Sequence, residues 1–215
     1  MFERLHPLIL FIIIVNILFS FKGFKNDYFF EKYKFNIKKI KGDEWIRVLS
    51  SGFLHVDNNH LFLNMLTLYF FGETVINFIG IIDFIIIYFG SLLLGNIISF
   101  YFHNSNDYYS AVGASGAIMG ILFSSILLDP EMKLIFIFFP IPLPGYVFGA
   151  GYLIYTLFGM KSQNDSIGHT AHFGGAIAGI LITILLDPGI IITSFFTLTL
   201  LLTTIIISGI IFFKK

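Results

Sequence analysis

Residues 5–21 read LHPLILFIIIVNILFSF, a run of almost entirely apolar side chains. A helix needs about 20 such residues to cross the hydrocarbon core of a bilayer, where its backbone groups must pair internally. No small-residue cleavage site follows the run, which distinguishes it from a signal peptide. We therefore interpret it as a retained membrane-spanning helix.

Six more apolar runs follow Asp57, separated by short connections. We expect them to span the membrane near His60–Ile79, Ile81–Phe102, Val112–Leu128, Tyr146–Phe158, Thr170–Leu186 and Ile190–Phe213. Before the fifth span, the apolar segment Leu134–Pro144 contains three prolines and is expected to lie in the membrane interface. The polar stretch Lys22–Arg47 is expected to form an ordered or interfacial loop. The sequence thus predicts an all-α polytopic membrane protein.

The overall composition excludes several other classes of protein. Of the 215 residues, 56% are hydrophobic and only 12% are charged, whereas soluble domains carry about 25% charged residues. Thirteen basic and thirteen acidic residues give no net charge, so the strongly basic balance typical of nucleic-acid-binding domains is absent from the sequence. Because the chain has no cysteine, disulfides, thiolate metal sites and cysteine nucleophiles are excluded as well.

Polar side chains inside the expected spans are costly and therefore point to function. His60 and Asn64 lie four positions apart, which places them about 40° apart on one helical face. Ser115 lies at the start of the fourth span, and His172 lies in the sixth. A serine hydroxyl becomes a good nucleophile when a base such as histidine takes its proton, and His, Asn and backbone N–H groups can stabilise an oxyanion. These residue types suffice for acyl transfer without a carboxylate.

Small residues accompany both candidate catalytic positions. Gly116 and Gly120 form a small-xxx-small stripe beside the serine, while Gly175 and Gly179 lie on the same face as His172. Such stripes let membrane helices pack backbone to backbone, which would bring the fourth and sixth spans within hydrogen-bonding range of each other.

Each feature alone also has a structural interpretation. A serine in a membrane helix commonly bonds its own i−4 carbonyl, glycine stripes are general packing devices, and a lone intramembrane histidine can be a structural donor or a proton relay. His55, His103 and His169 lie near span ends, where solvated histidines are expected. It is the joint occurrence of serine, histidine and donor pair that favours catalysis.

Other functions explain the polar residues less well. A channel or transporter predicts internal symmetry or buried charge pairs, and the sequence shows neither. Four histidines could suggest a metal site, but no carboxylate accompanies them and their depths differ. The sequence also lacks the His-Glu-x-x-His motif of zinc proteases and a pair of intramembrane aspartates.

Four motifs, in this order, resemble those of the rhomboid family of intramembrane serine proteases. They are EWIR at 44–47, FLH at 53–55 leading into HLFLNM at 60–65, GASG at 113–116, and AHFGG at 171–175. The resemblance runs from Trp45 to about Leu186. It implies a single membrane domain over residues 1–215, with a six-helix core in residues 1–187, a first loop at about residues 22–57, and an additional C-terminal span in residues 188–215.

The resemblance also implies roles for individual residues. Ser115 would be the nucleophile and His172 the general base and acid. His60, Asn64 and the Ser115 backbone N–H would form the oxyanion hole. The implied substrates are single-span transmembrane proteins that enter from the lipid between the second and fifth spans, and the reaction needs no cofactor, metal or nucleic acid. The alternative is a catalytically inactive rhomboid-like protein that binds membrane clients.

Further positions carry over with structural roles. Trp45 and Arg47 match the motif that orders the first loop in the family. The fifth span and the loop Met160–Gly168 would correspond to the gate and cap over the site. One departure is Met119, because family members often have an aromatic residue at this position beside the catalytic histidine; a thioether can also pack against an imidazole.

The distribution of charge bears on orientation. In the expected topology, eleven of the thirteen basic residues lie on the face of the first loop, and only Arg4 and Lys133 lie on the other face. The positive-inside rule would place the lysine-rich face, and the site with it, in the cytoplasm. The family resemblance instead implies a site that faces outward from the cell membrane, and we expect this second orientation.

Overall fold

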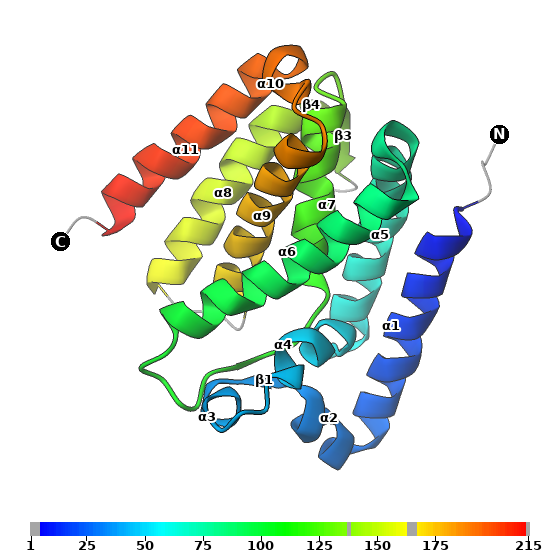
Figure 1. The fold of residues 1–215 in the computed structure, drawn as a ribbon, viewed down its shortest axis with the longest axis vertical. Coiled ribbons are helices and arrows are strands. Elements are labelled where there is room, and N and C mark those ends of the chain that lie inside the picture. Colours follow the sequence, from blue (N-terminus) through cyan, green and yellow to red (C-terminus); the bar gives the residue numbers. More distant parts are fainter. Residues whose placement is uncertain (1–4, 137–138, 163–166, 214–215) are drawn as a thin grey trace.

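The computed structural model describes residues 5–136, 139–162 and 167–213. It is a bundle of helices (Figure 1), which confirms the predicted all-α membrane class. The apolar helices are α1 (Pro7–Lys25), α5 (Asn58–Ile79), α6 (Ile81–Phe102), α7 (Ser115–Leu128), α8 (Gly145–Ser162), α9 (His169–Leu186) and α11 (Phe195–Phe213). Among the described helices, α1, α5, α6 and α9 are long and apolar enough to cross a membrane by themselves.

Local capping explains several helix boundaries. Helix α1 begins at Pro7, where a proline loses no helical hydrogen bond, and the preceding His6 side chain accepts from the backbone N–H of Leu8. Helix α5 begins after Asp57, whose carboxylate accepts from the N–H of His60 at 2.7 Å. Gly80, with φ of 90°, separates α5 from α6. The bounds of α6 are those expected from the sequence.

Except for α6, the spans differ from the expected ranges at one end or both, or by an interruption, and for two of them the structure gives the reason. The fourth span begins at Ser115 rather than Val112, because Gly113 has a φ of 132°, which is incompatible with a right-handed helix. Helix α8 extends beyond both expected ends of the fifth span. The last span is divided into α10 (Ile190–Thr193) and α11, since Ser194 leaves the helical conformation and donates its hydroxyl hydrogen bond to the carbonyl of Leu127 at 2.5 Å.

The polar stretch after α1 is an ordered loop. It contains α2 (Asp27–Tyr33), β1 (Phe35–Asn36), α3 (Ile37–Lys41) and the start of α4 (Ile46–Ser50), and it is followed by the 3-10 turn η1 (Ser51–Phe53). Strand β1 pairs antiparallel with β2 (Ser110–Ala111), which fixes the loop to the segment that leads into α7.

Arg47 lies at the centre of this first loop. Its guanidinium donates to the carbonyls of Glu31 at 2.7 Å and Lys34 at 2.9 Å, and it pairs with the carboxylate of Glu44 at 2.6 Å. Arg47 is only 3% exposed. Trp45, in contrast, is half exposed and packs on Phe100 with ring centroids 5.3 Å apart.

Most of the segment expected to lie in the membrane interface forms a pair of antiparallel strands. Strand β3 (Lys133–Phe136) pairs antiparallel with β4 (Phe139–Pro144). The prolines of β4 occupy alternate positions, so their missing N–H groups fall on one edge of the strand and leave the other edge able to pair. The apolar composition alone did not predict this pairing.

Helix α7 forms the centre of the bundle. Thirteen of its 14 residues are buried, and it packs against α5, α6 and α9. At 1.5 Å per residue its length is about 21 Å, which is less than the roughly 30 Å of the hydrocarbon core. Helix α1 packs outside α5, and α11 packs outside α8 (Figure 1).

Candidate active site

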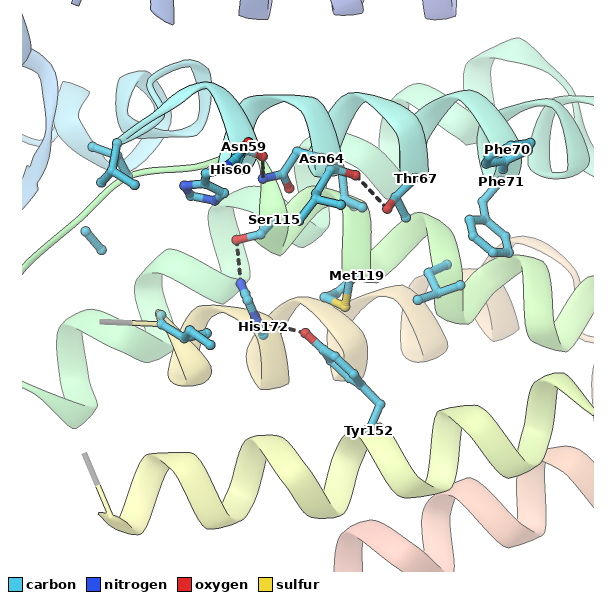
Figure 2. A pocket seen from close by; sticks show the side chains of 18 of the residues that line it. Asn59, His60, Asn64, Thr67, Phe70, Phe71, Ser115, Met119, Tyr152 and His172 are labelled. Atoms are coloured by element: carbon cyan, nitrogen blue, oxygen red, sulfur yellow. Dashed lines mark hydrogen bonds between the residues drawn. The ribbon is translucent and has the colours of Figure 1, made fainter. Parts of the chain in front are cut away.

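The structure brings two of the predicted site residues into direct contact. Ser115 is the first residue of α7, and His172 lies in the first turn of α9. The Oγ atom of Ser115 is 2.6 Å from Nε2 of His172 (Figure 2). This is the distance expected between a nucleophile and its general base.

Glycines on the two helices make this contact possible. A Cβ atom on Gly175 would overlap the carbonyl oxygen of Gly116, and one on Gly179 would lie 2.5 Å from Cα of Gly120. The backbones of α7 and α9 are therefore in contact along two turns, as the small-residue stripes predicted. Gly95 of α6 packs equally closely against α9, since its Cβ would lie 2.7 Å from the carbonyl oxygen of Ala171.

The second ring nitrogen of His172 also has a partner, which the sequence analysis missed. Its Nδ1 atom lies 2.9 Å from the hydroxyl of Tyr152 on α8 (Figure 2). The two rings are inclined by 25°, with centroids 6.3 Å apart. Met119, at the position where the family often has an aromatic residue, is buried and lines the same cavity. A tyrosine in an apolar span has a polar hydroxyl that needs a partner, and this was the available signal.

The backbone before Ser115 leaves space that a side chain would fill. Gly113 has a φ of 132°, and a Cβ atom there would lie 2.8 Å from Nε2 of His60 and 3.5 Å from Oγ of Ser115. The His60 imidazole and the Ser115 hydroxyl therefore flank one small space. Because Ser115 is the first residue of α7, its backbone N–H lies at the positive end of that helix. No side chain among the described residues caps this end.

Asn64 lies one turn after His60 on α5, and both side chains line the cavity (Figure 2). The Nδ2 atom of Asn64 donates to the His60 carbonyl at 2.9 Å. An amide nitrogen carries two hydrogens, so this bond leaves one N–H for another acceptor. The role of His60 and Asn64 in an oxyanion hole stays a prediction.

The expectation that His55, His103 and His169 are solvated is wrong, because all three are buried. His55 links α1 to the active-site turn. Its Nε2 accepts from the backbone N–H of Ala114 at 3.4 Å, which places the ring proton on Nδ1, 2.8 Å from the hydroxyl of Ser20. Burial, followed by the neighbouring His60 ring, lowers the pKa of His55 to about 3, so the imidazole is neutral.

Four of the six histidine rings lie in two pairs. Ring centroids are 4.9 Å apart for His55 and His60, and 6.4 Å apart for His169 and His172. Within the described ranges, no three His, Asp or Glu side chains are grouped as metal ligands would be.

A cavity of about 1380 Å³ extends from the Ser115–His172 pair between α5 and α8. Its polar end contains the candidate site residues, and its walls are largely apolar. The walls include Leu63, Phe70, Leu122, Leu134 and Phe148. Helix α8 thus borders the cavity, where the resemblance placed a gate. Residues 163–166 of the expected cap, Met160–Gly168, lie outside the described residues.

Several known proteins are similar to this chain. The model of the Rhomboid domain matches residues 42–188. Rhomboid protein 1, mitochondrial, of Saccharomyces cerevisiae is 29% identical over 139 residues, which cover 63% of this chain and 40% of that protein. The human Presenilin-associated rhomboid-like protein, mitochondrial, is 32% identical over 139 residues, or 62% of this chain and 36% of that protein.

A plant relative matches over a shorter region. RHOMBOID-like protein 4 of Arabidopsis thaliana is 44% identical over 85 residues, covering 40% of this chain and 21% of that protein. The matched regions span less than half the length of these relatives. The domain match, however, covers most of the present chain and contains all four motifs that carried the resemblance. This chain belongs to the rhomboid family.

Proposed function

We propose that the protein is an intramembrane serine protease that cleaves transmembrane-helix substrates with a Ser115–His172 dyad. The observation that carries this proposal is the 2.6 Å contact between the Ser115 hydroxyl and Nε2 of His172 at the polar end of an apolar cavity. A serine that served only to pack its helix would have no need of a histidine partner from another helix.

The proposed reaction has two stages. In the first, Nε2 of His172 takes the proton of the Ser115 hydroxyl as Oγ attacks the scissile carbonyl. The negative charge that develops on the carbonyl oxygen is stabilised by the Ser115 backbone N–H and by the side chains of His60 and Asn64. When the tetrahedral intermediate collapses, the peptide C–N bond breaks and His172 returns the proton to the leaving amine. Water, deprotonated by His172, then cleaves the acyl–serine ester.

The proposed substrates are single-span membrane proteins that enter from the lipid between α5 and α8. The apolar walls of the cavity support this class, because they match the side chains of a transmembrane segment. Its polar end supports cleavage near one end of that segment, where the peptide backbone can leave the helical conformation.

The location of the protein is a separate proposal. The mitochondrial names of the yeast and human relatives give no support to the expected cell membrane. We propose that the active site faces away from the cytoplasm. A reporter fused after Lys215 tests this orientation, because the expected seven-span topology places that residue on the face of the first loop. A cytoplasmic signal would overturn the orientation and agree with the positive-inside rule.

Cleavage of a generic single-span substrate in liposomes tests the function. We expect Ser115→Ala and His172→Ala to lose cleavage, while Ser105→Ala, which changes an exposed loop serine, keeps it. A fluorophosphonate probe should label the wild-type chain at Ser115. Cleavage that survives in Ser115→Ala would overturn the mechanism. Absence of both cleavage and labelling in the wild-type chain would favour the alternative, an inactive rhomboid-like protein that binds membrane clients.

A further inference from the structure

We propose that Tyr152 is a positioning residue for His172, and that it makes the reactivity of Ser115 depend on the seating of helix α8. This inference rests on the proposed function, because it assigns a role within that same site. It stands on three observations: the bond to Nδ1, the aromatic packing around the phenol, and the position of α8 at the edge of the cavity.

The hydrogen bond orients the imidazole and is compatible with its catalytic form. To accept the Ser115 proton, Nε2 of His172 must be without hydrogen, so the single ring proton of the neutral form lies on Nδ1. The Tyr152 oxygen, 2.9 Å from Nδ1, is then the acceptor for that proton. A ring turned over by 180° would lose both this contact and the 2.6 Å contact with Ser115. The other neutral tautomer keeps both contacts with donor and acceptor exchanged, so the bond fixes the orientation of the ring rather than its tautomer.

The same bond also favours proton transfer. Once His172 has taken the serine proton, both ring nitrogens carry hydrogen and the ring is positively charged. The Tyr152 oxygen continues to accept from Nδ1, and a hydrogen bond from a charged donor is stronger than one from a neutral donor. A carboxylate in this position would stabilise the charge more strongly, but an ionised group is costly to bury among apolar side chains. A phenol oxygen accepts the same hydrogen bond without burying a charge.

The surroundings of Tyr152 hold its ring in place. Phe148 lies on the same helix with ring centroids 5.7 Å apart, and Phe123 of α7 approaches it to 6.4 Å. Tyr155, the next tyrosine along α8, has its ring centroid 6.0 Å away but is half exposed and directed toward His169. The hydroxyl of Tyr152 therefore has a defined position relative to α7 and α9.

Helix α8 packs less closely on the two helices of the dyad than those two helices pack on each other. It packs mainly against α11 and less against α9 and α7, whereas α7 and α9 pack closely against each other. It also borders the cavity through which a substrate would enter. A displacement of α8 by one or two ångströms would break the bond to Nδ1 while leaving the Ser115–His172 pair on its own two helices. His172 is thus held by both of its hydrogen bonds only when α8 is packed in this position.

The substitution Tyr152→Phe tests the inference, because it removes the hydroxyl and keeps the ring. We expect kcat for a single-span substrate in liposomes to fall about tenfold or more, as for loss of one hydrogen bond to a charged group. KM should stay within about twofold, because the phenol orients the base and the apolar walls bind the substrate. Fluorophosphonate labelling of Ser115 should slow by a factor similar to that for kcat. The thermal unfolding midpoint should match that of the wild type.

Tyr155→Phe is the matched control, since it removes a phenol hydroxyl from the same helix one turn away; we expect wild-type kinetics. If Tyr152→Phe also behaves like the wild type, the inference is wrong, while loss of activity in Ser115→Ala and His172→Ala would leave the proposed function intact. A rise in KM or a lowered unfolding midpoint that accounts for the lost activity would assign Tyr152 a packing role and overturn the inference. If the wild-type chain neither cleaves nor labels, the proposed function fails, and this inference fails with it.

Discussion

The backbone of Gly175 lies directly against the carbonyl group of Gly116, with no room for a side chain between them. One turn later, Gly179 meets Gly120 in the same way. The contact joins the two helices that carry Ser115 and His172, so the separation of the proposed catalytic atoms is set by backbone contact.

Replacing Gly175 with alanine should therefore separate α7 from α9. Because the new methyl group overlaps backbone, we expect Gly175→Ala to lower the free energy of unfolding by about 1–3 kcal/mol and to reduce proteolysis strongly. Thermal unfolding and substrate cleavage, both in detergent, measure the two effects. Gly151→Ala is the control, because no described atom would lie within 4 Å of its Cβ. Equal activity of the two variants would contradict the prediction.

Gly113 offers a test of the proposed oxyanion site. A methyl group at Gly113 would lie 2.7 Å from Cε1 of His60, in the space proposed for the oxyanion. We expect Gly113→Ala to lose cleavage by about a hundredfold or more, as when an oxyanion donor is removed. Gly80→Ala imposes a similar backbone strain, with φ of 90°, but meets no described atom within 4 Å. It should lose stability while its folded fraction keeps its activity. Comparable cleavage per folded molecule in the two variants would count against the oxyanion site.

Arg47 should stabilise the first loop through its several acceptors. Arg47→Lys keeps the charge but cannot reach two carbonyls and a carboxylate together. We expect the free energy of unfolding to fall by about 1–3 kcal/mol and proteolytic nicking in residues 26–45 to become faster. Lys38→Met, which changes an exposed lysine of the same loop, is the control. An unchanged nicking rate in Arg47→Lys would show that the loop is held by other contacts.

Acidification should destabilise the fold through His55. Burial lowers the pKa of His55 to about 3 in the native state, against an ordinary value of 6.5 in the unfolded chain. Between these values the unfolded state binds a proton that the native state does not. The contribution of neutral His55 to the free energy of unfolding is therefore complete above pH 6.5. It falls as the pH is lowered towards 3, with a limiting slope of about 1.4 kcal/mol per pH unit.

His55→Gln should flatten this dependence, because an amide can accept from the Ala114 N–H but does not titrate. Unfolding midpoints at pH 7.5, 6, 5 and 4 measure the difference between the two slopes. Asp57 and His60, which adjoin His55, are unchanged in the variant. Identical slopes for the variant and the wild type would contradict the prediction.

Much of the fold followed from hydropathy, because a membrane helix needs a long apolar run and little else. The range Ile81–Phe102 was predicted residue for residue. The Ser115–His172 pair was also predictable, since glycine stripes encode close approach and polar groups in lipid need partners. The order and spacing of the motifs then indicated the family.

Other features depended on contacts that a linear sequence does not reveal. The partner of His172 is Tyr152 on α8. Nearly all faces of this helix are apolar, so hydropathy cannot specify which face points towards the site. His55 is buried because α1 and the active-site turn both cover it. The pairing of β3 with β4 depends on cross-strand contacts, which the apolar composition of this segment does not reveal.

The shortness of α7 has a consequence for what happens after the proposed cleavage. A central helix of about 21 Å cannot reach both surfaces of a hydrocarbon core about 30 Å thick, and the groups around Ser115 are mostly neutral. Hydrolysis there would convert one uncharged amide into a carboxylate and an ammonium group. Both are poorly solvated in such a place unless water or a counter-charge reaches them. The site would therefore hold the intact substrate more favourably than its fragments, and the new chain ends would leave towards water because they carry charge.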